Sequence, residues 1–337
     1  MVKMSYVKPS IKSKHFEDFK NKLPKMYDKT VIITGTTSGT GYVAAKTLAE
    51  LGARVIMLNR PSSRSLKVHE EILKTHPNSD LTTINCDLQS FKSVNNAINE
   101  IKKRFSEGID VICNNAGVMA LKDISTVDGY DIQMQTNHLS HFLLTCELIP
   151  LLKKNSILKG ESRIVNHSSI ARHSVRKLEK IYLEKNGGNL GGNGKSLFFG
   201  GARWKRYGQT KLANAAFSAA LHNKLKNHRI KSLFAHPGLS NTELQITTLK
   251  DGGMPKFFTR KMMKRSQSEE DGAMGIISCI CLPNIKSGQF WGPGKGLLAI
   301  KGKAKPYDFE KKYNNDRTID LIWEKSCNAV GRKYNFN

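Results

Sequence analysis

Tyr207 and Lys211 are the two side chains of this sequence whose spacing most directly indicates chemistry. They lie four residues apart in YGQTK, a segment with a helical pattern, so both project from one face of a helix about one turn apart. A tyrosine phenol titrates near pH ~10, but a nearby ammonium favours the phenolate and lowers its pKa by roughly one to three units. The pair is therefore predicted to exchange protons with a substrate near neutral pH.

The same spacing occurs by chance on many amphipathic helices, so its weight depends on neighbouring motifs. Ser168 and Ser169 follow SRIVNH, an apolar segment typical of a buried strand. A hydroxyl at the carboxyl end of such a strand can donate a hydrogen bond to a substrate carbonyl oxygen. The alternative for each serine is a helix cap or turn former, which fits one of them well.

A glycine-rich turn lies near the start of the chain. Gly35, Gly39 and Gly41 in VIITGTTSGTGYVAAK separate a strand-like run from a helix-like run, and a second strand-like run follows. Glycines permit the tight turn and a close approach to a pyrophosphate, and the helix N-terminus presents free N–H groups and a positive dipole. A dinucleotide-binding turn is therefore predicted, with an ordinary strand-to-helix turn as the alternative.

The end of the second strand-like run indicates which dinucleotide binds. An acidic residue there would bind the ribose 2′-hydroxyl of NAD. This sequence has Asn59 and Arg60, with Ser62, Ser63 and Arg64 nearby and no carboxylate. A cation and hydroxyl groups suit a 2′-phosphate, so NADP(H) is the predicted cofactor, and NADPH favours the direction of reduction. The alternative for Arg60 is a solvated surface charge.

The elements that would position these residues alternate between strands and helices. This alternation is typical of parallel strands joined by crossover helices, so the predicted fold class is α/β, a single Rossmann-like, doubly wound parallel sheet flanked by helices. Ligands of such sheets bind beyond the carboxyl ends of the strands. Strands are predicted near 30–35, 54–58, 81–86, 109–114, 162–168 and 231–235, and helices near 39–51, 63–75, 90–106, 128–153, 204–227, 269–281 and 316–330.

The sequence is divided into a basic N-terminal extension, residues 1–28, and a single NADP-binding oxidoreductase domain, residues 29–337. The stretch NGGNLGGNGKSLFFGG at 186–201 is predicted to be a flexible insertion, since its glycine content is too high for an ordered element. It could be a substrate lid, but low-complexity glycine favours a solvated surface loop. A basic run follows, Arg203-Trp204-Lys205-Arg206.

A segment rich in Met and Phe, 254–263, carries lysines between its apolar residues. It could be a mobile substrate lid or a surface-binding amphipathic helix, and the sequence does not choose between them.

The balance of charge is strongly basic, with 54 Lys and Arg against 28 Asp and Glu and a formal net charge of +26. Such a field attracts phosphates, anionic lipid or nucleic acid. The basic residues are spread along the chain, and no groove-reading motif or stacking array is found, so nucleic acid is not an expected partner.

The six cysteines lack the dense spacing of a secreted disulfide scaffold, which favours reduced thiols in an intracellular compartment. No stretch approaches the roughly 18 consecutive apolar residues of a membrane span, and the first 20 residues lack the apolar core of a secretory signal. A cytoplasmic protein is predicted, with peripheral attachment to an intracellular membrane as the alternative.

Seven motifs occur in a characteristic order: TGTTSGTG (34–41), CDL (86–88), CNNAGVM (113–119), NHLSHF (137–142), RIVNHSS (163–169), YGQTK (207–211) and HPGLSNT (236–242). With them the sequence resembles the short-chain dehydrogenase/reductase family, and within it the retinol dehydrogenase-like branch of NADP-dependent members. The resemblance covers roughly 28–245, and a more distant similarity continues in SGQFWGPG (287–294) and around Trp323.

The resemblance implies a role for each matched position. Tyr207 would be the general acid for reduction, Lys211 would lower its pKa and bind the nicotinamide ribose, and Ser169 would orient the substrate carbonyl. Asn137 would anchor a water that links Lys211 to solvent. The implied cofactor contacts are Gly35, Thr37, Ser38, Gly39, Thr40, Gly41, Arg60, Asp87, Leu88, Asn115, Ala116, Gly117, Tyr207, Lys211, Pro237, Gly238 and Thr242.

Two features depart from the family pattern. Ser169 and Tyr207 are separated by 37 residues, more than is usual in the family. His167 stands where a small or apolar residue usually precedes the paired serines, which leaves the shape of the substrate pocket near it open. His138 and His141 lie three apart, but no acidic or cysteine partner follows at metal-site spacing, so no metal is expected.

The predicted function is the reduction of a carbonyl group, or oxidation of the matching alcohol, in a small hydrophobic molecule with NADP(H). The branch resemblance suggests retinoid-like or steroid-like substrates. A non-catalytic NADP(H)-binding sensor or scaffold is the alternative, although it would have no need of a complete proton-donor set. Epimerases and dehydratases of related fold share the Tyr and Lys spacing but usually differ in the glycine turn. A homodimer stays open.

Overall fold

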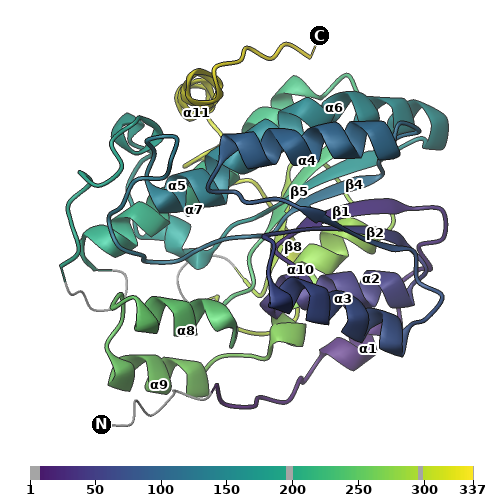
Figure 1. The fold of residues 1–337 in the computed structure, drawn as a ribbon, viewed down its shortest axis with the longest axis horizontal. Helices are drawn as coiled ribbons and strands as arrows, with labels where there is room; N and C mark the ends of the chain where they lie inside the picture. Colours follow the sequence, from purple (N-terminus) through teal and green to yellow (C-terminus); the bar gives the residue numbers. More distant parts are fainter. Residues whose placement is uncertain (1–7, 195–199, 295–298, 337) are drawn as a thin grey trace.

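One sheet forms the centre of the protein (Figure 1), which we describe from a computed structural model for residues 8–194, 200–294 and 299–336. Strands β1 to β7 run parallel, and β8 pairs antiparallel with β7 at one edge. The predicted doubly wound α/β class is confirmed. The order across the sheet is β3 (Leu81–Asn85), β2 (Arg54–Asn59), β1 (Thr30–Thr34), β4 (Val111–Asn114), β5 (Ser162–His167), β6 (Ile230–Ala235), β7 (Gln289–Gly292) and β8 (Lys305–Asp308).

The central strands form where the sequence has continuous apolar runs. Every residue of β1, β4 and β5 is buried, as expected for parallel strands that are covered on both faces. Strands β7 and β8, with four residues each, are absent from the prediction. At least half of each strand is not buried, so neither has the continuous buried run that identifies β4 at the same length.

Helices cover both faces of this sheet, and each face has its own apolar core. One face carries α1 (Phe16–Lys20), α2 (Gly39–Glu50), α3 (Ser63–Thr75) and α10 (Glu269–Cys281). The other carries α4 (Phe91–Arg104), α6 (Ser140–Lys159) and α7 (Gly201–Lys224), with α11 (Asp316–Val330) packed against α7. Two further helices, α8 (Glu243–Lys250) and α9 (Lys256–Lys264), lie apart from both layers in Figure 1.

The helix predicted near 128–153 is divided in the structure. It begins as α5 (Ile132–Met134), continues as a π-helical turn over Gln135–Leu139 and then becomes α6. Asp131 caps its start, because one carboxylate oxygen accepts hydrogen bonds from the N–H groups of Gln133 and Met134. A π-turn widens the helix locally and is frequent at functional sites.

The described part of the glycine-rich segment, residues 186–194, is largely exposed, but its backbone is anchored. The Asp123 carboxylate accepts hydrogen bonds from the backbone N–H groups of Gly188, Leu190 and Gly192, at 3.1, 2.7 and 2.8 Å. Leu190 is buried. Residues 195–199 of the predicted loop lie outside the described residues.

The basic run that follows is also not the surface patch that its charges indicate. Arg203, Trp204 and Arg206 are buried in the first turns of α7, and only Lys205 is exposed. The two buried guanidinium groups are paired with carboxylates distant in sequence, which a local pattern cannot show.

We expect Phe142→Ala to lower the free energy of unfolding by about 3–5 kcal/mol, because it removes a large ring from a close-packed core. The Phe142 side chain is fully buried, and its ring centroid lies 5.1 Å from that of Phe217 and 5.3 Å from that of Trp323. Urea denaturation measures the change. Ile157→Ala, on the same helix at a residue that is 77% exposed, is the control, and an equal loss in both variants would contradict the packing described here.

Candidate active site

A cavity of about 740 Å³ opens where the strand order reverses, beyond the carboxyl ends of β1 and β4. Most of the site residues predicted from the sequence line it: Gly35, Thr37, Ser38, Gly39, Thr40, Arg60, Asp87, Leu88, Asn115, Ala116, Gly117, Ser169, Tyr207, Lys211, Pro237, Gly238 and Thr242. Two do not, Gly41 and Asn137, and both lie directly behind the lining.

The glycine-rich turn has the geometry that a phosphate-binding turn requires. Gly35 and Gly39 have φ angles of 70° and 63°, in the left-handed region that favours glycine. The side chain of Ser38, the N-cap of α2, makes no capping hydrogen bond, so the first N–H groups of this helix are available to an anion.

Gly41 acts through packing and does not face the cavity. A Cβ atom at this position would lie 2.2 Å from Nδ2 of Asn115 and 2.3 Å from the carbonyl oxygen of Gly35. Asn115 Nδ2 donates to that carbonyl and to the carbonyl of Thr34, at 3.1 and 2.9 Å. Glycine at 41 therefore lets α2 approach the amide that holds the turn in place.

Two arginines lie at the cavity end beyond β2. Arg60 and Arg64 are exposed and line the cavity, and neither has an ion-pair partner within the described ranges. Both polar atoms of the Asn59 side chain, by contrast, bond to the turn. Its Oδ1 accepts a hydrogen bond from the N–H of Thr36, and its Nδ2 donates one to the Thr36 hydroxyl, both at 2.8 Å. The arginines are thus the groups of this end that can bind an anion.

Helix α7 brings the proton-transfer pair to the other end of the cavity. Lys211 Nζ lies 5.7 Å from the centroid of the Tyr207 ring and donates to the carbonyl of His167 at 3.0 Å. The hydroxyl-bearing side chains of Tyr207 and Ser169 both line this end of the cavity. The neighbouring Ser168 has a structural role, because its hydroxyl donates to the Lys211 carbonyl at 2.7 Å and ties β5 to α7.

The predicted lowering of the Tyr207 pKa by Lys211 is not found, because burial dominates. Burial raises the pKa of the Tyr207 phenol to about 12, and the hydrogen bond with Ser169 lowers it by a smaller amount. Burial lowers the pKa of the Lys211 ammonium to about 8. A phenol that keeps its proton at neutral pH is suited to donate a proton, which is the role that carbonyl reduction requires.

Asn137 lies in the π-turn and connects two parts of the site. Its Oδ1 accepts from the N–H of Val118 at 2.7 Å, and its Nδ2 donates to the Val118 carbonyl and the Thr210 hydroxyl, both at 2.9 Å. A Cβ atom at Gly117 would lie 3.2 Å from Asn137 Oδ1 and 3.5 Å from Lys211 Nζ. Asn137 thus lies beside the lysine while holding the segment after β4.

His167 lines the cavity, and its hydrogen bonds fix its tautomer. Asn115 Nδ2 donates to two carbonyls, so Asn115 Oδ1 is the acceptor of the 2.9 Å contact and His167 Nδ1 carries the proton. Burial lowers the pKa of His167 to about 3, with a smaller contribution from Lys211, which keeps the ring neutral. Nε2 of His167 is therefore an unprotonated acceptor at the cavity wall.

Apolar residues that the sequence analysis did not select surround the Tyr207 side. Trp204 packs edge-on against Tyr207, with ring centroids 5.9 Å apart, and Met119 and Met262 join them in one cluster. Trp204 precedes Tyr207 by three residues, so helical spacing alone could have identified it. Met262 comes from α9, and only the tertiary structure brings it here.

The fold and the site can now be compared with known proteins. The sequence model of the family described as short chain dehydrogenase matches residues 29–183. Retinol dehydrogenase 11 of Homo sapiens is 34% identical over 223 residues, covering 64% of this chain and 62% of that protein. Retinol dehydrogenase 12 of Bos taurus is 28% identical, covering 92% and 89%. The predicted resemblance to the short-chain dehydrogenase/reductase family, and within it to the retinol dehydrogenase-like branch, is confirmed.

Other proteins match a shorter part of the sequence or share the fold. The short-chain dehydrogenase TIC 32 A of Brassica napus, a chloroplast protein, is 37% identical over 64% of this chain. The chain spans just under two thirds (65%) of that relative's length. A Mycobacterium paratuberculosis protein has a TM-score of 0.70 at 26% identity, with 94% and 98% of the two chains covered. A 3-ketoacyl-(acyl-carrier-protein) reductase of Brucella melitensis, solved with NADH, has a TM-score of 0.58 at 23% identity, covering 77% and 95%, which shows the fold alone.

Lys211→Met is expected to stabilise the protein by about 3 kcal/mol at pH 7, because burial of the ammonium lowers its pKa from 10.5 to about 8. A lysine with a lowered folded pKa costs stability below that pKa, and the cost disappears as the pH rises from about 8 to 10.5. Urea denaturation at pH 7 and pH 10 measures the difference. Lys205→Met, at an exposed position of the same helix, should show no such gain, and a gain for Lys211→Met that is equal at both pH values would contradict the burial of the charge.

Proposed function

We propose that the chain is an NADP(H)-dependent oxidoreductase that reduces the carbonyl group of a small hydrophobic molecule. One observation carries this proposal: Ser169, Tyr207 and Lys211 line one end of a cavity whose other end holds the glycine-rich turn and Arg60. A proton donor and a dinucleotide site thus share one space.

The residues at the cofactor end fit a nicotinamide dinucleotide with a 2′-phosphate. The turn offers backbone N–H groups at a helix N-terminus, and a Cβ atom at Gly35 would lie 2.7 Å from that of Ala116, so the turn tolerates no side chain there. The turn would bind the diphosphate, Arg60 and Arg64 the 2′-phosphate, and Asp87 and Leu88 the adenine. Asn115, Ala116 and Gly117 would flank the cofactor, and Pro237, Gly238 and Thr242 would contact the carboxamide.

The chemistry then divides between the cofactor and three side chains. The bound cofactor supplies the hydride that reaches the carbonyl carbon. Ser169 donates a hydrogen bond to the substrate carbonyl oxygen, and Tyr207 transfers its phenolic proton to the same oxygen. Lys211 stabilises the resulting phenolate by its positive charge and binds the nicotinamide ribose. In the reverse direction the phenolate of Tyr207 takes the proton of an alcohol.

The substrate end of the cavity supports an apolar substrate. Met119, Trp204, Leu239, Leu244 and Met262 line it near Tyr207. Such a lining binds hydrocarbon by burial, while Ser169 and Tyr207 supply the polar contacts that orient the carbonyl. Retinol is the compound in the names of the related retinol dehydrogenases, and an aldehyde or ketone of retinoid-like or steroid-like character suits this lining.

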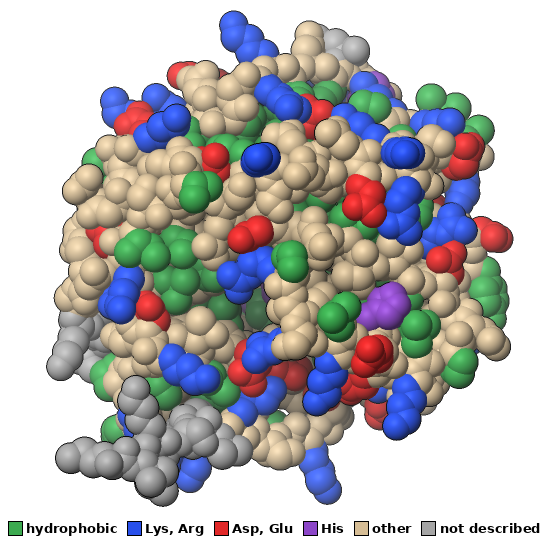
Figure 2. Space-filling model, in the orientation of Figure 1, with side chains coloured by type: hydrophobic (Ala, Val, Ile, Leu, Met, Phe, Trp, Pro, Cys, Tyr) green, Lys and Arg blue, Asp and Glu red, His purple; other side chains and the backbone are tan. Residues whose placement is uncertain are grey.

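None of the helices in the described ranges combines the length and apolar character that crossing a bilayer requires. Figure 2 shows Lys and Arg side chains spread over the visible face, with Asp and Glu among them. Helix α9 exposes Phe257 next to Lys256, with Arg260 and Lys261 one turn on. This surface supports peripheral contact with an anionic membrane as a second location beside the predicted cytoplasmic one; a homodimer stays a prediction.

Tyr207→Phe should reduce kcat for NADPH-dependent carbonyl reduction by roughly 10²–10⁴-fold, the contribution typical of a positioned general acid. The affinity for NADPH should stay within about twofold, because the phenol is needed in the proton transfer. NADPH absorbance is followed with a panel of aldehydes and ketones. Tyr27→Phe, at an exposed tyrosine, is the control. A panel in which no carbonyl oxidises NADPH, or a Tyr207→Phe variant as active as the wild type, would count against the proposal.

Arg60→Ala should weaken binding of NADPH by roughly tenfold or more and leave NADH unchanged, because the guanidinium contributes a charged hydrogen bond to the 2′-phosphate alone. Dissociation constants from the quenching of protein fluorescence give both affinities. Arg54→Ala, at the opposite end of β2 and paired with Asp80, controls for the loss of a surface charge. Equal weakening of NADPH and NADH would argue against a 2′-phosphate contact.

A further inference from the structure

A buried ion pair joins the N-terminal turn of α7 to the connection between α8 and α9. Arg203 Nη1 donates to the Asp251 carboxylate at 2.8 Å and to the carbonyl oxygens of Asp251 and Ala120 at 3.1 and 3.2 Å. The Arg203 side chain is 4% exposed and that of Asp251 26%. The same Asp251 oxygen accepts from the N–H of Lys122 at 2.7 Å. One carboxylate therefore connects α7, the segment after β4 and the α8–α9 connection.

Neighbouring contacts close the same junction. The Trp204 indole N–H donates to the Gly253 carbonyl at 3.2 Å, and the Thr248 hydroxyl donates to the Met119 carbonyl at 2.7 Å. A Cβ atom at Gly253 would lie 2.3 Å from the Ala120 carbonyl oxygen, so only glycine permits this approach. The α8–α9 unit is thus held at its turn, close to the residues that line the substrate end.

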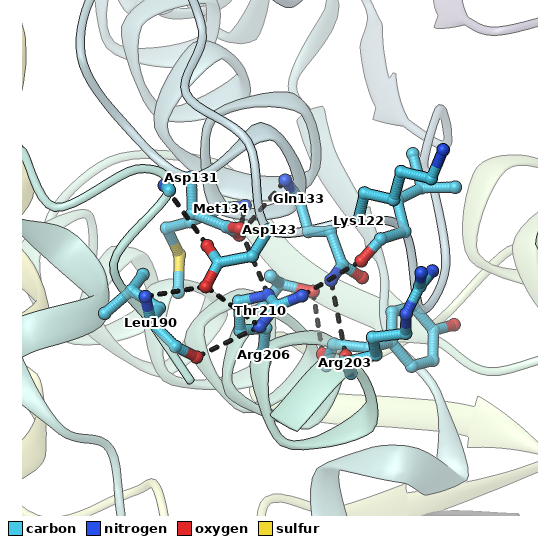
Figure 3. Close-up of polar contacts among 12 residues, drawn as sticks. Lys122, Asp123, Asp131, Gln133, Met134, Leu190, Arg203, Arg206 and Thr210 are labelled. Carbon is cyan, nitrogen blue, oxygen red and sulfur yellow. Dashed lines mark hydrogen bonds and ion pairs between the residues drawn. The ribbon is translucent and has the colours of Figure 1, made fainter. Parts of the chain in front are cut away.

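A second set of buried charges makes the base of this junction rigid (Figure 3). The Arg206 guanidinium donates to the carbonyls of Leu190 and Leu121, at 3.0 and 3.1 Å, and lies 3.5 Å from the Asp123 carboxylate and 3.4 Å from that of Asp131. Asp123 in turn binds the backbone of the glycine-rich segment. Arg203 therefore projects from a fixed turn, whereas the α8–α9 unit on its other side is the part that this pair restrains.

The restrained unit contributes directly to the substrate wall. Met254, in the α8–α9 connection, and Met262, in α9, pack in one apolar cluster with Met119, Trp204 and Tyr207. Arg203 itself does not line the cavity within the described residues. Loosening the pair would therefore move the apolar wall without touching the hydroxyl groups that transfer the proton.

We propose that Arg203 and Asp251 are positioning residues that clasp the α8–α9 unit, residues 243–264, against α7 and thereby set the affinity for a large apolar substrate. The effect on substrate rests on the proposed carbonyl reduction, while the clasp itself can be tested without turnover. Lys205 and Glu179 provide a matched comparison. Lys205 lies on α7 beside Arg203 and pairs with Glu179, which precedes a separate turn, and the two side chains are 49% and 33% exposed. Exposed pairs of this kind contribute little.

The first experiment separates KM from kcat. In Asp251→Asn, KM for a large apolar aldehyde such as retinal should rise roughly ten- to hundredfold, the loss typical of a buried charged hydrogen bond. Its kcat, the KM for a three-carbon aldehyde and the NADPH affinity should stay within about twofold, since Tyr207 and Ser169 are untouched. Arg203→Lys keeps the positive charge but loses the several N–H donors of the guanidinium group, so its increase in KM should be intermediate. Glu179→Gln should match the wild type.

The second experiment needs no activity. Amide hydrogen exchange over 243–264 should accelerate in Asp251→Asn, remain at the wild-type rate in Glu179→Gln, and be insensitive to Tyr207→Phe. If no carbonyl oxidises NADPH in the wild type, the proposed function fails while this measurement still decides the clasp. Unchanged exchange over 243–264 in both Asp251→Asn and Arg203→Lys, or equal KM increases for the large and small aldehydes, would overturn the proposal; Arg203→Lys serves alone if Asp251→Asn does not fold.

Discussion

The architecture of the site depends on one amide group, that of Asn115. Its nitrogen donates to the carbonyls of Thr34 and Gly35 at the end of β1, and its oxygen accepts from Thr40 in α2 at 3.1 Å and from His167 at the end of β5 at 2.9 Å. All the hydrogen-bonding capacity of this buried amide is used, so it joins two backbone carbonyls and two side chains at the reversal of strand order. The glycine at position 41 is the complement of this arrangement, because any side chain there would displace the amide.

Burial at the same edge determines the state of the proton-transfer pair. The Tyr207 phenol and the Lys211 ammonium both lie away from water, and burial disfavours the charged form of each, raising one pKa and lowering the other. The pair is therefore held as a neutral phenol beside a costly cation, a state suited to proton donation. The price in stability falls on the lysine, whose ammonium binds the His167 carbonyl.

Features that depend on a local sequence pattern could be predicted from the sequence. The glycine-rich turn, six of the strands and the spacing of Tyr207 and Lys211 are each encoded within a few residues. The structure places the turn, Tyr207 and Lys211 around one cavity. The usual behaviour of a residue type was a poor guide where distant residues change its surroundings. Glycine-rich sequence is usually mobile and arginine usually solvated, yet residues 186–194 are ordered by Asp123, which is about 65 residues away, and Arg203 and Arg206 are buried.

This difference follows from how the two ends of the cavity are built. The cofactor end consists of turns at strand ends, each of which is specified by a short motif, and the amide of Asn115 joins them. The substrate end is assembled from segments after β4, before α7 and within α8 and α9, which meet only through buried ion pairs and carbonyl contacts between distant residues. Buried pairs of this kind add little net stability compared with apolar packing, but they allow few alternative arrangements. A wall held in this way can change its apolar residues while the proton donor stays in place, which separates the choice of substrate from the chemistry performed on it.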